Sequence, residues 1–239
     1  MARLGTIRHN INRVWDESKV LRDWRGRFAT KGSKKRRGSP EGERMNPAAP
    51  YSPYSGDKSP DERFTDLGVL VIGGVETVPK ELAHLVADGL ERAKAMGGNL
   101  PKFFLFDDNK ADENGDAGVA SYTPMFDMMT IYSDDSYWKD PWNQAAYQRD
   151  TGFWATDNPL NPVYHEIGHK THRDLRGTKG LRRAKAEQPS PLVENKVSEY
   201  AMTNGAEFVA ETYAGLLYGK TYPPEVMEEY RRFGGPRVL

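Results

Sequence analysis

Residues 165–169 read His165-Glu166-Ile167-Gly168-His169, a pattern whose chemistry requires a helix. Four residues make about one helical turn, so both imidazole rings leave the same face and can bind one metal ion. Glu166 lies between them and can reach a water molecule held on that ion. Two histidines and a third ligand leave one position of such a metal open for water. The sequence therefore predicts a helix that carries a metal site with room for a water molecule.

Charge is distributed unevenly along the 239 residues. Residues 1–46 contain 13 Lys and Arg against five Asp and Glu, a net charge of +8, so the neutral chain carries −8 over the remainder. Residues 1–62 are rich in Arg, Lys, Gly, Ser and Pro, and only 37% of the whole chain is hydrophobic. This composition predicts a mostly disordered basic N-terminal arm over 1–62 and a folded domain over 63–239. Such a basic tail is typical of contact with acidic partners.

Features that the sequence lacks disfavour several kinds of site and several cellular locations. The chain has no cysteine, which excludes disulfides, thiolate zinc ligands and a cysteine nucleophile. No apolar run approaches the roughly 20 residues that span a bilayer. The N-terminus leads into charged residues rather than a signal-peptide core. We therefore expect no membrane contact, and a protein that stays in a cytoplasm or is packaged from one.

Apolar patterning predicts an α+β domain. The expected elements are, in chain order, a strand at 67–72, a helix over 82–90 that stops before Gly97, a strand at 103–106, and a strand pair or one long strand within 120–132. Residues 134–160 hold three of the five tryptophans, and we expect an aromatic-rich loop there that packs on the body.

The helix that carries the histidines has signals at both ends. Asn161 can cap it, and Pro162 suits its first position, where a missing N–H costs nothing. Gly177 is the natural stop. Beyond it we expect a charged, mobile link over 178–191, a helix at 193–202, and a helix at 207–218 that opens after Asn204 and ends at Gly219.

A third ligand is needed, because two histidines alone do not hold a catalytic zinc tightly. His172 lies on the same helical face, but one more turn should carry its ring past an ion shared by His165 and His169. We expect His172 to be an exposed helix residue. The metzincin pattern HExxHxxGxxH is excluded, since it needs Gly at 172 and His at 175, where the chain has Leu175. No Asp follows Gly177 closely enough for the aspartate-ligand pattern.

Two glutamates on the later helix remain as candidates. Glu207 and Glu211 are one turn apart and share a face, so one can bind the ion while the other orients a ligand histidine. A competing interpretation makes Glu207 the N3 residue of an Asn204-x-x-Glu207 capping pattern, with Glu211 exposed to solvent. Asn204 can cap the helix without Glu207, which favours the ligand interpretation.

These residues resemble a known family. Gluzincin metallopeptidases related to the catalytic domain of anthrax lethal factor, and similar domains in bacteriophage and mobile-element proteins, share HExGH followed further along by Y-x-x-T-N-x-x-E-[FY]-x-A-E. The chain matches this pattern at His165, Glu166, Gly168, His169, Tyr200, Thr203, Asn204, Glu207, Phe208, Ala210 and Glu211. The match covers about residues 155–218.

The resemblance implies a zincin-like metallopeptidase domain, with a small twisted sheet, an active-site helix and C-terminal helices. It implies that Zn²⁺ is bound by His165, His169 and Glu207, that Glu166 is the general base, that Tyr200 stabilises the oxyanion, and that Glu211 supports a ligand histidine. The implied reaction is hydrolysis of a protein or peptide substrate lying along an edge strand within 118–132. Two histidines and a carboxylate also suit other transition ions.

Residues 22–29 of the arm resemble an R-D-x-x-G-R-F-A element of tailed-phage head and portal-associated proteins. This implies a phage-encoded protein, in the virion or the host cytoplasm, whose arm contacts head or portal proteins or packaged DNA. A second hypothesis is a virion structural protein whose zinc domain is a rigid module with little or no turnover. Glu166 and Tyr200 favour the peptidase, because a structural site needs neither a base nor an oxyanion donor.

Overall fold

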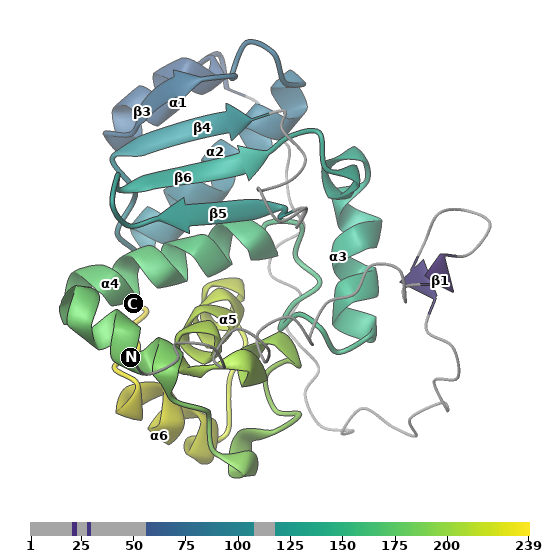
Figure 1. Ribbon diagram of the computed structural model, residues 1–239. Coiled ribbons are helices and arrows are strands. Elements are labelled where there is room, and N and C mark those ends of the chain that lie inside the picture. Colours follow the sequence, from purple (N-terminus) through teal and green to yellow (C-terminus); the bar gives the residue numbers. More distant parts are fainter. Residues whose placement is uncertain (1–20, 23–27, 30–55, 108–117) are drawn as a thin grey trace, which may run out of the picture. The chain divides into compact units, whose positions relative to one another are not determined.

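A computed structural model describes residues 21–22, 28–29, 56–107 and 118–239 of the chain (Figure 1). The chain divides into two compact units, Met1–Arg44 and Met45–Leu239. In the first unit, β1 (Leu21–Arg22) pairs with β2 (Phe28–Ala29) in antiparallel fashion, inside the arm expected to be mostly disordered. Residues 1–20, 23–27 and 30–55 of that arm lie outside the described part, so the expected disorder there stays a prediction.

The second unit contains a four-stranded mixed sheet in the order β3-β4-β6-β5 (Figure 1). Its strands are β3 (Leu70–Gly73), β4 (Phe103–Asp107), β5 (Ala120–Thr123) and β6 (Met128–Tyr132). β3, β4 and β6 are parallel, and β5 pairs antiparallel with β6 at one edge. The predicted strands therefore form, and the stretch 120–132 is a strand pair.

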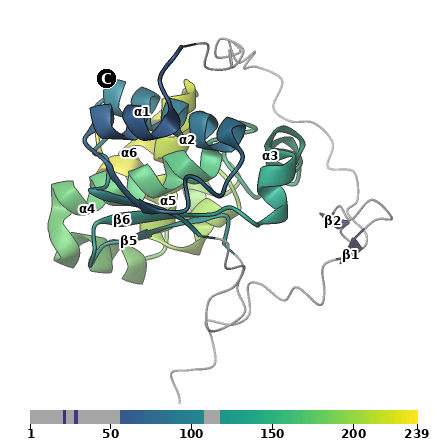
Figure 2. The same ribbon diagram turned by 90° about the horizontal axis from the view of Figure 1, so that it is seen from above.

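Helices α1 (Pro60–Leu67) and α2 (Lys80–Ala95) lie on one face of this sheet (Figure 2). α1 is fixed at its start by a capping box, in which Ser59 and Glu62 satisfy each other's backbone N–H. The predicted domain boundary at residue 63 falls inside this helix. Because α1 continues to Leu67, the first strand of the sheet begins three residues later than predicted.

One part of the core lies between the sheet and these helices. Phe104 and Phe106 of β4 and Met129 and Ile131 of β6 are almost fully buried. Phe64 of α1 packs its ring 5.1 Å from that of Phe104. Burial of each such side chain contributes about 1.5–3 kcal/mol to the stability of the fold. The sheet, α1 and α2 therefore form a stable layer against which the later helices pack.

The helix with the two histidines is α4 (Asn161–Ala186), and it starts differently from the prediction. Leu160 is its N-cap residue, and Asn161 lies inside the helix, so the predicted capping role of Asn161 is wrong. Its side chain instead accepts a hydrogen bond from the Thr156 hydroxyl and donates to Glu211. Asn161 is thus turned toward the interior of the unit.

Gly177 interrupts α4 with φ 68° and ψ 174°, as a stop residue should. The helix then resumes, so the predicted mobile link is wrong over 178–186. The physical reason is that Leu181 and Ala184, three residues apart, are both buried and give this segment an apolar face.

The remaining helices lie on either side of α4 in the chain. A helix α3 (Pro141–Asp150), preceded by the 3₁₀ turn Ser136–Lys139, replaces the loop expected there, since Asp140 caps it and Pro141 starts it. α5 (Gly205–Tyr218) confirms the helix predicted after Asn204, and α6 (Pro224–Arg232) was not predicted. No helix in the described part of the chain is long and apolar enough to cross a membrane.

The helix predicted at 193–202 is wrong. That stretch contains only parts of two short 3₁₀ turns, η3 (Pro191–Val193) and η4 (Tyr200–Thr203). Asn195 between them has φ 62°, a left-handed conformation that a helix cannot include. Tyr200 is therefore carried by a short turn rather than by a helix.

Candidate metal centre

α4 and α5 approach each other closely at Gly168. A Cβ atom at this position would lie only 3.0 Å from the Cα of Ala210 and 3.3 Å from its carbonyl oxygen. Glycine on one helix and alanine on the other therefore let the two backbones come together. The close approach brings Glu207 and Glu211 of α5 within reach of the histidines of α4, and it gives a physical reason for the small residues of both motifs.

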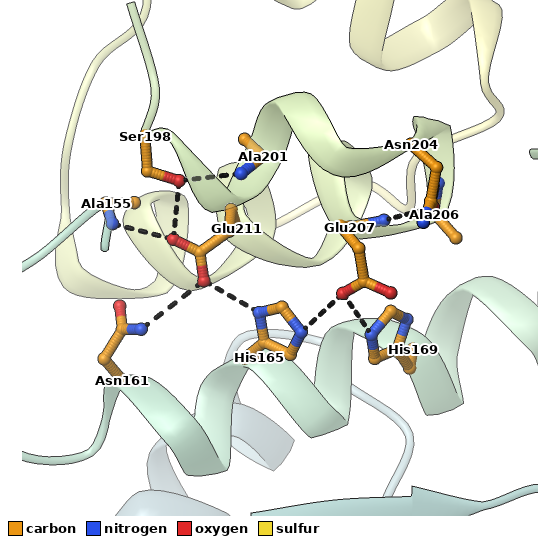
Figure 3. A network of polar contacts seen from close by, with 10 residues as sticks. All are labelled: Ala155, Asn161, His165, His169, Ser198, Ala201, Asn204, Ala206, Glu207 and Glu211. Carbon is orange, nitrogen blue, oxygen red and sulfur yellow. Dashed lines mark hydrogen bonds and ion pairs between the residues drawn. The ribbon is translucent and has the colours of Figure 1, made fainter. Parts of the chain in front are cut away.

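Two histidines and one glutamate converge between these helices (Figure 3). The Nε2 atoms of His165 and His169 each lie 3.0 Å from Oε2 of Glu207. One donor atom of each side chain lies within 4.8 Å of the others. His165 and Glu207 are 5% and 8% exposed. These three residues, predicted from two separate motifs, form a group that can hold a metal ion.

Glu207 does not act as the helix cap that the competing interpretation proposed. Asn204 alone caps α5, since its side-chain oxygen accepts from the N–H groups of Ala206 at 2.9 Å and Glu207 at 3.1 Å. Glu62 of α1 does take part in capping its helix, since its carboxylate accepts a hydrogen bond from the backbone N–H of Ser59. The carboxylate of Glu207 instead faces the two histidines.

Glu211 is fully buried and surrounded by donors (Figure 3). Its Oε2 accepts from the N–H of Ala155 at 2.7 Å and from the Ser198 hydroxyl at 2.9 Å. Its Oε1 lies 2.7 Å from Nδ1 of His165 and 3.5 Å from Nδ2 of Asn161. With its position so fixed, Glu211 determines how the His165 ring is turned.

The contacts of His165 show why a cation fits this site. A neutral imidazole has a single N–H, and when Nδ1 donates it to Glu211, a lone pair is left on Nε2. That lone pair faces an oxygen of Glu207, an arrangement that needs a proton or a metal ion between the two atoms. The distance from Oε2 of Glu207 to each histidine Nε2 is 3.0 Å, close to the roughly 3.3 Å expected between two ligand atoms of tetrahedral zinc. The residues therefore fit such an ion.

The pKa values of His165 and Glu207 also favour a cation at this site. Burial lowers the pKa of His165, but its contacts with Glu207 and Glu211 outweigh burial and raise this pKa well above the usual value. Burial raises the pKa of Glu207, yet the neighbouring His169 and His165 leave this pKa well below its usual value. Both shifts express the same preference for positive charge between the imidazoles and the carboxylate.

Glu166 lies beside this group, on the side of the edge strand. Burial raises the pKa of its carboxyl group, with partial compensation by His165 and His169. The backbone N–H of Tyr122, on β5, donates a hydrogen bond to it. A carboxyl group with a raised pKa, held between α4 and a strand edge, is suited to accept and return a proton.

Tyr200 lies in the segment 187–204 that connects α4 to α5, and its ring stacks on the ring of His165. Its ring centroid lies 5.3 Å from that of His165, with 26° between the ring planes. Burial, followed by the charges of Glu207 and Glu166, raises the pKa of its hydroxyl above the usual value. The hydroxyl therefore stays protonated at neutral pH and can donate a hydrogen bond.

His172 is not exposed, contrary to the prediction. It is fully buried, and its Nε2 lies 2.9 Å from the carbonyl oxygen of Phe233, just after α6. Burial lowers its pKa to about 4, so the ring is neutral. The prediction failed because α6, which leads to Phe233, was not recognised. His172 is not part of the group of His165, His169 and Glu207, in agreement with the expectation that it is no ligand.

Sequence reasoning missed Asn161 and Ser198, which both contact Glu211. Asn161 precedes His165 by four residues, so the spacing that revealed the two histidines could also have placed Asn161 on their face. Ser198 lies outside any regular element and leaves no such signal. Comparison with known proteins finds no matching family model and no similar curated protein. The contacts among the site residues are therefore the main guide to function.

Proposed function

We propose that this protein is a zinc-dependent endopeptidase that hydrolyses peptide bonds with a metal-activated water, in the manner of the gluzincins that its motifs resemble. The proposal is carried by one observation. His165, His169 and Glu207, from two motifs in different parts of the chain, form one ligand group. Glu166 lies beside that group. A purely structural metal site would need no carboxylate in that place.

Three side chains of this protein would hold the ion. Zinc supplies a Lewis acid and lowers the pKa of its bound water from 15.7 to about 7. The Nε2 atoms of His165 and His169 and a carboxylate oxygen of Glu207 would be its ligands. Glu211 would keep the proton of His165 on Nδ1 and so leave the Nε2 lone pair free to bind the ion.

Two further residues would carry the proton and charge movements. Glu166 would take a proton from the attacking water and pass it to the leaving amine, for which its raised pKa is suitable. Tyr200 would donate a hydrogen bond to the former carbonyl oxygen as that atom gains negative charge. Its raised pKa keeps the proton that this role requires.

The edge strand β5 offers a place for the substrate. It pairs with β6 on one side and has no strand partner on the other among the described residues. Tyr122 of β5 already contacts Glu166 through its backbone. A peptide added along this edge would use main-chain hydrogen bonds, so the scissile bond could approach Glu166 with little dependence on side-chain sequence.

The arm suggests the setting of this activity. The resemblance of residues 22–29 to phage head and portal-associated proteins supports a phage-encoded protein, acting in the virion or the host cytoplasm. The charge of +8 over residues 1–46 suits contact with acidic head or portal proteins or packaged DNA. Deleting these residues should remove that partner and leave peptide cleavage intact.

Glu166→Gln tests the proposal against a rigid structural zinc module. We expect the wild-type protein to cleave casein or a peptide library, and the variant to lose at least about a hundredfold in kcat because the base is gone. Both proteins should bind one zinc ion. Glu76→Gln, at an exposed turn outside the site, is the matched control and should keep full activity. Equal behaviour of wild type and Glu166→Gln, with zinc bound in both, would reject the peptidase.

A further inference from the structure

We infer that Phe153 is a positioning residue for Tyr200. Residues 152–155 would thereby hold Tyr200 and Glu211, which both contact His165, in place. This inference rests on the proposed function, because it concerns the same site. It begins from rings that lie in a row. Phe153 stacks on Tyr200 with centroids 5.3 Å apart and 27° between planes, and Tyr200 stacks on His165 at the same distance. The Tyr200 ring therefore stacks with two neighbouring rings.

The backbone of the same segment supports this stack. The N–H of Tyr200 donates to the carbonyl oxygen of Phe153 at 3.2 Å, and the N–H of Glu199 donates to that of Gly152 at 2.7 Å. Two residues further on, the N–H of Ala155 donates to Glu211 at 2.7 Å. Residues 152–155 therefore contact both the tyrosine and the carboxylate that turns His165.

Tyr200 needs this support because its own element is short. η4 contains only four residues, so few helical hydrogen bonds fix its orientation. An oxyanion donor acts only when its hydroxyl lies within about 3 Å of the developing charge and in the right direction. Without the Phe153 ring, Tyr200 loses one of its two stacking partners and the phenol can tilt. The ligands His165, His169 and Glu207 are held by α4 and α5 and would not move.

This division predicts a specific kinetic effect. In the full-length, zinc-loaded protein, Phe153→Leu should lower kcat about tenfold through misplacement of the donor. KM should change less than about twofold, and zinc stoichiometry should stay at one. Phe153→Tyr keeps an aromatic ring and should restore most of the kcat. Trp142→Leu removes a partly exposed ring from α3 and is the matched control, with an unchanged kcat expected.

A double-mutant cycle separates positioning from a general structural role. In the Tyr200→Phe background the hydroxyl is already gone, so adding Phe153→Leu should cost less than about twofold in kcat. A tenfold loss in both backgrounds, or no loss in either, would overturn the inference while leaving the peptidase intact. Absence of Glu166-dependent cleavage in the wild-type protein would instead overturn the proposed function, and the role of Phe153 with it.

Discussion

Two regions meet at the metal centre and hold their side chains in different ways. α4 and α5 are long helices whose contact at Gly168 and Ala210 fixes the ligand group. The segment 187–204 that joins them contains short turns, and Tyr200 within it is held from outside, by stacking on the Phe153 ring and by a backbone hydrogen bond to Phe153. Metal binding should therefore depend on helix packing, whereas the proposed oxyanion donor should depend on local contacts. Substitutions in each region should therefore affect separate properties.

Glu207→Ala should have the largest effect, because it removes a ligand from the helix pair. We expect zinc affinity to fall by more than about a thousandfold, and activity with it. A competition titration against a chromophoric chelator measures this affinity. Glu228→Ala, on the exposed surface of α6, is the matched control. Undiminished zinc binding in Glu207→Ala would remove Glu207 from the ligand group.

Tyr200→Phe tests the connecting segment alone, since the ring and its stacking remain. We expect kcat to fall about a hundredfold with unchanged zinc affinity, because only the hydrogen-bond donor is lost. Steady-state kinetics and the same zinc titration give both quantities. A fall in zinc affinity comparable to that of Glu207→Ala would show that the two regions do not act separately.

Glu211→Gln should have an intermediate effect, because Glu211 touches both regions. It contacts His165 on α4 and Ser198 on the connecting segment. An amide cannot accept on both sides, so we expect zinc affinity to fall about 10- to 100-fold. The zinc titration measures it, with the exposed Glu228→Gln as the control. An affinity equal to that of the wild type would mean that helix packing alone orients His165.

His172→Gln should show the smallest effect, and only in stability. Burial holds the pKa of His172 at about 4, against 6.5 for an exposed histidine. Below pH 6.5 the unfolded chain binds a proton that the folded protein does not bind until about pH 4, so the free energy of unfolding falls as the pH drops. Urea unfolding of the metal-free protein should show that the wild type loses about 2 kcal/mol more than His172→Gln between pH 7 and 5. Equal losses would show that His172 is exposed or already charged.

The parts of the site on regular helices were predictable from sequence. His165 and His169 follow from their spacing, and Asn204 marks the start of α5, because helix geometry relates sequence distance to direction. The 3₁₀ turn under Tyr200 and the burial of His172 were not predictable in this way. Both depend on elements distant in sequence, namely residues 152–155 and α6, whose packing leaves no local pattern.

The helix contact at Gly168 also links metal binding to folding. His169 and Glu207 are separated by 38 residues, so in an unfolded chain their side chains are far apart on average, and an ion would bind there only weakly. An ion held by the assembled helices closes this loop and stabilises the folded state alone. At a thousand times its dissociation constant, such an ion adds about 4 kcal/mol to the free energy of unfolding. The melting temperature should therefore rise with the concentration of free metal. The ion should stabilise the tertiary structure in addition to its role in catalysis.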